Sequence, residues 1–233
     1  MTGKNTLFEE GSTRQNLFDE VLGGTDALNA IHTMRFHGRM VEPKFTLEDF
    51  NVIRMKPHFQ KVWIPVGEGC FAEGYNEQYA WEKPVADAHG HIVEGAPADA
   101  LRHAMELPGV MMPLSQFITR GNSFELVNEG EVDGRWVYLL KATLTDGFVK
   151  AYYMDAETYL ITRSRDVRAF HPSVDLTENH IETVMSDFRV VDGVMVAFRE
   201  SQRDWVTGEI LGELTWRTVE INPDLNRGEF EMP

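Results

Sequence analysis

The chain has little cysteine and no long apolar run. Cys70 is the only cysteine among 233 residues, so an intramolecular disulfide and a cysteine-rich metal site are both excluded. No stretch of 18 consecutive apolar residues is present, which excludes an ordinary membrane-spanning helix. The first fifteen residues lack the apolar core of an export signal, so the protein is either cytoplasmic or has had its signal removed.

Basic residues are scarce. Lysine and arginine total 22 against 37 aspartates and glutamates, which gives a formal net charge of −15. Such a chain repels phosphate backbones, and this argues against nucleic acid as the main partner. It also argues against docking on anionic lipid headgroups through basic patches.

Catalytic motifs are missing as well. The sequence has no Gly-x-Ser-x-Gly elbow, no phosphate-binding glycine loop and no His-Glu-x-x-His. Asp87, His89 and His91 alternate, and two imidazoles with a carboxylate can bind a divalent metal. However, the segment 83–96 reads as a long loop with no further ligand nearby, so solvated loop histidines are the favoured interpretation. We therefore expect no catalytic residue, no metal, no cofactor and no enzymatic activity.

What the sequence does contain is a series of hairpin signals. Asp-Gly pairs between apolar runs occur at 133–134, 146–147 and 192–193, and such pairs favour two-residue type I′ turns because both residues accept positive φ. These turns predict an antiparallel meander in the second half of the chain. Its expected strands are 123–128, 135–144, 147–155, 158–168, 176–190, 194–206 and 209–221.

The sequence of the first half of the chain predicts short helices and further strands. Two helices are expected before residue 32, and Pro97 suits the first turn of a helix that ends near Leu107. The expected strands are 34–40, 44–55, 58–66, 70–75 and 78–82. Because these few helices cannot cover both faces of a parallel sheet, we predict a mainly β (α+β) fold with one large antiparallel sheet.

We expect one domain, residues 1–233, without a sharp change in composition. Segments 1–11 and 223–233 are expected to be peripheral, and 97–117 to form a helical lid that hinges at Pro108-Gly109 and Pro113. A strongly curved sheet with helices on its concave side leaves a cavity, which is a common ligand site.

Aromatic and methionine side chains are the candidates for lining such a cavity. They gather in the middle hairpins and the helical insertion, and thioethers and aromatic rings make adaptable apolar surfaces. For any single residue, packing in an ordinary core is the simpler interpretation. The candidates are Phe36, Trp63, Phe71, Tyr75, Tyr79, Trp81, Met105, Met111, Met112, Trp136 and Tyr152.

Five parts of the chain form a recognisable series. They are 22–31 with 34–38, the hairpin 74–84, the stretch from 124–127 to 159–160, the segment 187–196, and Ile221-Asn222-Pro223 with Phe230. Taken in this order, from about Leu17 to Phe230, they resemble the LolA-like family of outer-membrane lipoprotein-sorting proteins, in a branch distinct from the carrier LolA itself. Glu77 stands where the family hairpin usually has glycine, and Lys61 stands near an expected arginine.

The resemblance implies a half-open barrel whose concave face is apolar and covered by a few helices. It also implies non-enzymatic binding of lipid or lipoprotein acyl chains in the periplasm, with the export signal removed. A second hypothesis is an envelope signalling or stress module that uses the same fold to bind a protein partner. A metal-dependent enzyme is a third and weaker hypothesis. The sequence leaves the oligomeric state open.

Overall fold

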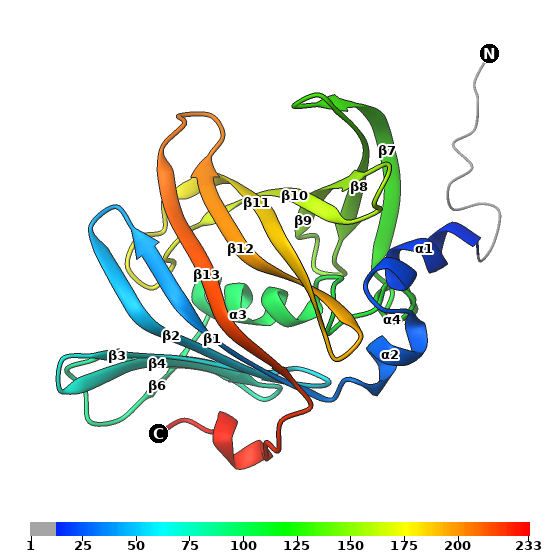
Figure 1. The fold of residues 1–233 in the computed structure, drawn as a ribbon. Helices are drawn as coiled ribbons and strands as arrows, with labels where there is room; N and C mark the ends of the chain where they lie inside the picture. Colours follow the sequence, from blue (N-terminus) through cyan, green and yellow to red (C-terminus); the bar gives the residue numbers. More distant parts are fainter. Residues whose placement is uncertain (1–12) are drawn as a thin grey trace.

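A computed structural model describes residues 13–233, so the segment 1–11 that we expected to be peripheral lies outside the described residues. The described chain forms one thirteen-stranded antiparallel sheet with four α-helices (Figure 1). The helices are α1 (Thr13–Val21), α2 (Thr25–Ala30), α3 (Ala96–Glu106) and α4 (Leu114–Thr119). The strands are β1 (Thr33–Glu42), β2 (Phe45–Met55), β3 (Phe59–Val66), β4 (Gly69–Asn76), β5 (Ala80–Lys83), β6 (His91–Val93), β7 (Ser123–Val132), β8 (Arg135–Thr143), β9 (Val149–Asp155), β10 (Ile161–Ala169), β11 (Glu178–Val191), β12 (Val194–Asp204) and β13 (Ile210–Ile221).

Two meanders make up the sheet. The strand order is β6-β5-β4-β3-β2-β1-β13-β12-β11-β10-β9-β8-β7, so each meander follows chain order and the pairing of β1 with β13 joins them. The sheet curls around α3 but does not close, because β6 and β7 are separate edges (Figure 1). The mainly β fold with an open half-barrel is confirmed.

Two of the Asp-Gly turns have the expected backbone. Asp133-Gly134 has φ of 51° and 78°, and Asp192-Gly193 has φ of 48° and 82°, as a type I′ turn requires. The prediction is wrong at Asp146-Gly147, where only the glycine has positive φ, at 94°. There the loop is longer, because the Leu144 amide donates to the Phe148 carbonyl and β9 begins only at Val149.

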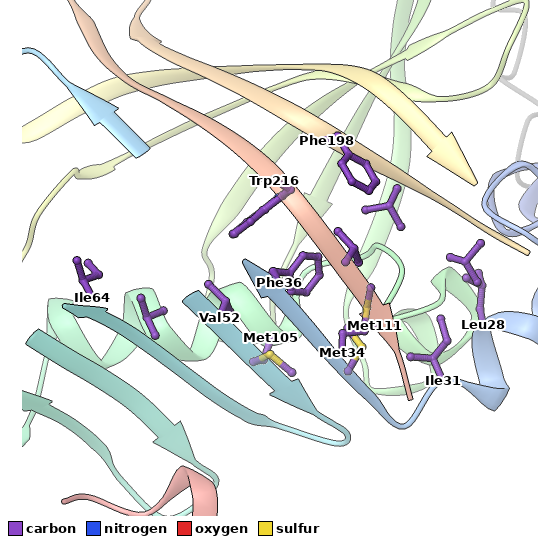
Figure 2. Close-up of a cluster of buried hydrophobic side chains, with 14 residues drawn as sticks. Leu28, Ile31, Met34, Phe36, Val52, Ile64, Met105, Met111, Phe198 and Trp216 are labelled. Atoms are coloured by element: carbon purple, nitrogen blue, oxygen red, sulfur yellow. The ribbon is translucent and has the colours of Figure 1, made fainter. Parts of the chain in front are cut away.

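The apolar core lies mainly on the concave face and consists of two clusters. The first joins α2, α3 and the segment after α3 to the central strands β1, β2, β3, β12 and β13 (Figure 2). Phe36 and Trp216 lie at its centre, with ring centroids 5.0 Å apart. The second joins α1 and α4 to β7, β8 and β9, and Phe117 of α4 is fully buried in it. The helices therefore stay on the sheet because they complete its concave core.

A smaller cluster lies on the outer face of the sheet. The C-terminal segment folds back across β3 and β4 and places Phe230 against Phe59, with ring centroids 5.6 Å apart. Phe230 is 0% exposed, although residues 223–233 were expected to be peripheral. The carbonyl of Phe230 also accepts a 3.0 Å hydrogen bond from the indole of Trp81.

Candidate ligand site on the concave face

The concave face carries most of the sequence-predicted candidates. Phe36, Phe71, Met105 and Met111 pack in or against the first cluster, and Met112 and Tyr152 lie in the second. Tyr75 lies near Arg102 and Glu106 of α3, and burial followed by Glu106 raises its pKa. Seven of the eleven candidates therefore gather where the helices meet the sheet. Whether they contact a ligand stays a prediction.

The other four candidates lie elsewhere, because successive strand residues point to opposite faces. Trp63 packs with the outer cluster, next to Val62 in the concave core. Trp81 is buried under the C-terminal segment, and the hydroxyl of Tyr79 donates a 2.8 Å hydrogen bond to Glu231 in the same segment. Trp136, close to the β7–β8 turn, is 53% exposed.

Charged groups also line the concave side, and the sequence analysis missed them. Nε of Arg54 donates to Gln60 at 2.9 Å, and its guanidinium carbon lies 5.7 Å from the ring centroid of Phe36. Burial lowers the pKa of Arg54, and the nearby carboxylate of Glu200 opposes this shift. Side chains alternate between the two faces of a strand, so the alternation that places Phe36 and Val52 on this face also places Arg54 and Glu200 there. This alternation was the sequence signal that could have predicted the charged residues.

A second charged pair lies on the same side. Nζ of Lys150 donates to Asp166 at 2.6 Å, and both side chains are largely buried. Burial, and then the charge of Asp166, raise the pKa of Tyr152. The concave face is thus mainly apolar but contains fixed charges, an arrangement that suits an amphiphilic ligand better than a purely apolar one.

Helix α3 is fixed to the far part of the sheet. The carboxylate of Asp146 accepts a 2.6 Å hydrogen bond from Arg102 and lies 2.8 Å from Nε2 of His103. The imidazole of His103 also lies against the ring of Phe148, with centroids 4.2 Å apart. Despite the cost of burial, these contacts hold the pKa of Asp146 well below its usual range. These contacts fix α3 to the loop before β9, and whether residues 97–117 act as a lid stays a prediction.

One loop crosses the open side of the half-barrel. Residues 170–177, which we call the strap, connect β10 to β11, yet they contact β1 and β5. The hydroxyl of Ser173 hydrogen-bonds the carboxylate of Glu82, and Nε2 of His171 lies 3.0 Å from the carboxylate of Glu42. β5 and β10 are eight positions apart in the strand order, so the strap links distant parts of the sheet.

The strap lies close to a pair of opposed carboxylates. Glu73 of β4 is the direct cross-strand partner of Glu82. Burial, and then the like charge of Glu82, raise the pKa of Glu73 from 4.5 to about 7. The hydrogen bond to Glu42 raises the pKa of His171. In both cases the folded protein binds a proton that the unfolded chain releases more easily, so protonation stabilises this region.

We expect Glu73→Gln to stabilise the protein at alkaline pH. The stability that the raised pKa of Glu73 contributes is lost as pH rises through about 7. The stability that the raised pKa of His171 contributes is lost as pH rises above 6.5, the ordinary pKa of histidine. At about pH 8 the free energy of unfolding should therefore rise by about 2 kcal/mol in Glu73→Gln, with little change near pH 5. Urea denaturation at both pH values measures this, and Glu68→Gln, at an exposed turn, is the control. Equal effects of both variants would contradict the assignment.

The metal hypothesis finds no geometric support in the part of the chain that the structure describes. Residues 13–233 contain no group of three or more histidine, cysteine, aspartate or glutamate side chains that could hold one metal ion. His91 lies in the short edge strand β6, and Asp87 lies in the loop before it. Among the same residues, no helix is long and apolar enough to cross a membrane.

Comparison with known proteins identifies the fold. The sequence matches no family model, and no curated protein matches it significantly. Among solved structures, a DUF1329 family protein from Desulfovibrio piger is 14% identical with a TM-score of 0.62, covering 93% of this chain and 95% of the other. The LolA superfamily protein NE2245 from Nitrosomonas europaea is 12% identical with a TM-score of 0.59, covering 91% and 96%.

The chain has the LolA-like fold. The resemblance seen in the sequence is thus confirmed at the level of the fold, across nearly the whole chain. In this chain the helices lie against the concave face of the sheet, and that face carries the two apolar clusters and the charged pairs. Sequence identities of 12% and 14% support a shared fold, and they support no conclusion about function.

Proposed function

We propose that this LolA-like protein binds lipid or lipoprotein acyl chains on its concave face, without catalysis, in the bacterial cell envelope. The observation that carries the proposal is the continuous apolar contact between α2, α3 and the central strands, which forms the largest cluster of buried apolar residues in the described chain. The fold shared with a LolA superfamily protein supports it. This proposal places the protein in the periplasm.

The energy of such binding comes from burial of the acyl chain. Each methylene moved out of water contributes about 0.8 kcal/mol, so one acyl chain contributes roughly 8–12 kcal/mol before the costs of ordering. Met105, Met111 and Met112 fill the space between helix and sheet in the present state. Their flexible thioether side chains can repack around a ligand more easily than branched side chains can.

The charged groups of the concave side would hold the polar end of the ligand. The terminal nitrogens of Arg54 remain available for a carboxylate or phosphate, because its described hydrogen bond uses only Nε. The half-buried carboxylate of Glu200 lies within its electrostatic reach. An amphiphile with an anionic group would therefore gain an ion pair in addition to apolar burial.

The direct test is displacement of a fluorescent fatty acid by unlabelled lipids. We expect micromolar or tighter binding of the probe, competition by long acyl chains and about tenfold weaker binding for Arg54→Gln. Arg199→Gln, on the outer face of the sheet, is the matched control. Organic extraction of the purified protein followed by mass spectrometry gives an independent readout of bound lipid. Folded protein that neither binds the probe nor carries lipid would contradict the proposal.

A further inference from the structure

The exposed apolar side chains of this protein are not scattered. Among the described residues, thirteen large apolar side chains are exposed, and seven of them lie in or beside five turns. The turns follow β1, β3, β5, β10 and β12. The seven residues are Phe45, Val66, Val85, Val174, Leu176, Val206 and Ile210. We call this set the apolar rim.

The sheet topology places all five turns at one end of the half-barrel. In the antiparallel order β5-β4-β3-β2-β1-β13-β12-β11-β10, every second strand runs in the same direction. β5, β3, β1, β12 and β10 are those strands, so their C-terminal turns emerge together. Figure 1 shows the β1–β2 and β12–β13 turns at this end, with α1, α2 and α4 at the other. The apolar rim therefore surrounds the end of the barrel that the helices leave open.

The strap contributes the most exposed members of the rim. Val174 is 88% exposed and Leu176 is 67% exposed, while Ser173 on the same loop binds Glu82. The strap thus contacts the sheet through the side chains of His171 and Ser173, while Val174 and Leu176 are exposed. Next to the β12–β13 turn, a groove of about 470 Å³ continues the apolar surface, with Val149, Val167 and Trp205 among its lining residues.

We propose that the apolar rim docks this protein on the surface of an electrically neutral, zwitterionic lipid membrane. The apolar side chains stand on separate turns, and a lipid surface accepts separated points of insertion, whereas a protein partner needs one contiguous complementary patch. The net charge of the rim determines whether neutral or anionic lipid headgroups are favoured. Its turns carry Glu68, Asp87, Asp175 and Glu209 against a single lysine, Lys44, so anionic lipids would repel it.

This inference goes beyond acyl-chain binding and can be tested apart from it. Flotation with phosphatidylcholine vesicles should carry the wild-type protein upward, and vesicles with about a third phosphatidylglycerol should carry less of it at low salt. The double variant Val206→Asn/Ile210→Asn, at the β12–β13 turn and outside the strap, should bind phosphatidylcholine vesicles about tenfold more weakly or worse. Val190→Asn is the matched control, because Val190 is 64% exposed, against 65% for Val206 and 62% for Ile210, but lies near the β11–β12 turn at the opposite end.

The fatty-acid displacement assay without vesicles separates the two proposals. The rim variant should keep wild-type fatty-acid affinity, which also shows that it is folded. Wild-type protein that does not float with phosphatidylcholine, or equal flotation of the rim variant and Val190→Asn, would overturn the docking proposal. Rim-dependent crosslinking to an envelope protein without vesicle binding would overturn it in favour of a protein partner. Flotation without fatty-acid binding would leave docking in place and contradict the proposed function.

Discussion

A reversible crosslink between positions 82 and 173 is expected to abolish uptake of a fluorescent fatty acid. The strap, which follows β10, is held to β5 by Ser173–Glu82 and to β1 by His171–Glu42 across the open side of the half-barrel. If the ligand enters between the helices and the sheet, these contacts must break first. A short thiol-to-thiol reagent on Glu82→Cys/Ser173→Cys, in a Cys70→Ser background, prevents this separation, and a reducing agent that cleaves the reagent should restore uptake.

The opposite change should speed uptake. The two contacts together contribute about 1.5–2.5 kcal/mol, because each has a carboxylate partner but both strap side chains are partly exposed to water. Ser173→Ala combined with His171→Ala should therefore raise the rate of fatty-acid uptake by about 10–100-fold in stopped-flow fluorescence, with a smaller change in affinity. The control crosslink joins Arg199→Cys to Glu213→Cys on neighbouring strands of the outer face. A similar loss of uptake with both crosslinks would exclude the strap as the entry barrier.

Phe230→Ala is expected to destabilise the protein by about 3–4 kcal/mol, the largest single effect on stability that we predict. Phe230 is fully buried against Phe59, and its carbonyl accepts the indole hydrogen bond of Trp81. Truncation leaves a cavity beneath the C-terminal segment and loosens the cover of Trp81. Urea denaturation followed by tryptophan fluorescence measures the loss.

The neighbouring variant Asp224→Ala provides the control, because Asp224 lies in the same segment and is exposed. It should change the free energy of unfolding by no more than about 0.5 kcal/mol. The concave face should be unaffected, so Phe230→Ala protein that is still folded should bind fatty acid as the wild type does. A cost below about 1 kcal/mol for Phe230→Ala would show that the C-terminal segment is not an integral part of the outer core.

Local turn chemistry made most of the strands predictable. The two Asp-Gly pairs at residues 133–134 and 192–193 form the expected tight turns, with positive φ at both residues of each pair. At 146–147 a helix intervenes, since Arg102 and His103 of α3 bind the carboxylate of Asp146 and the loop around it is longer. This contact joins residues more than 40 positions apart, and no local pattern indicates it.

The elements that the sequence analysis missed are short ones. Strand β6 has three residues and exists because β5 offers it an unpaired edge. Helix α4 has six residues after Pro113 and is held by the burial of Leu114 and Phe117. Segments of this length contain too few residues to show a period, and their conformation comes from the surface they pack against.

For the candidate site, too, one part could be predicted from the sequence and the other could not. The sequence by itself determined the antiparallel meander, the scarcity of helices and the aromatic and methionine residues available for an apolar face, because these follow from local spacing and turn residues. Only the tertiary structure decided which of those residues share a face, placing Met105 and Phe36 together and Trp81 under the C-terminal segment. It alone also brought the strap to β5 and gathered five turns into the apolar rim, because strand order and sheet curvature join residues that lie far apart in the chain.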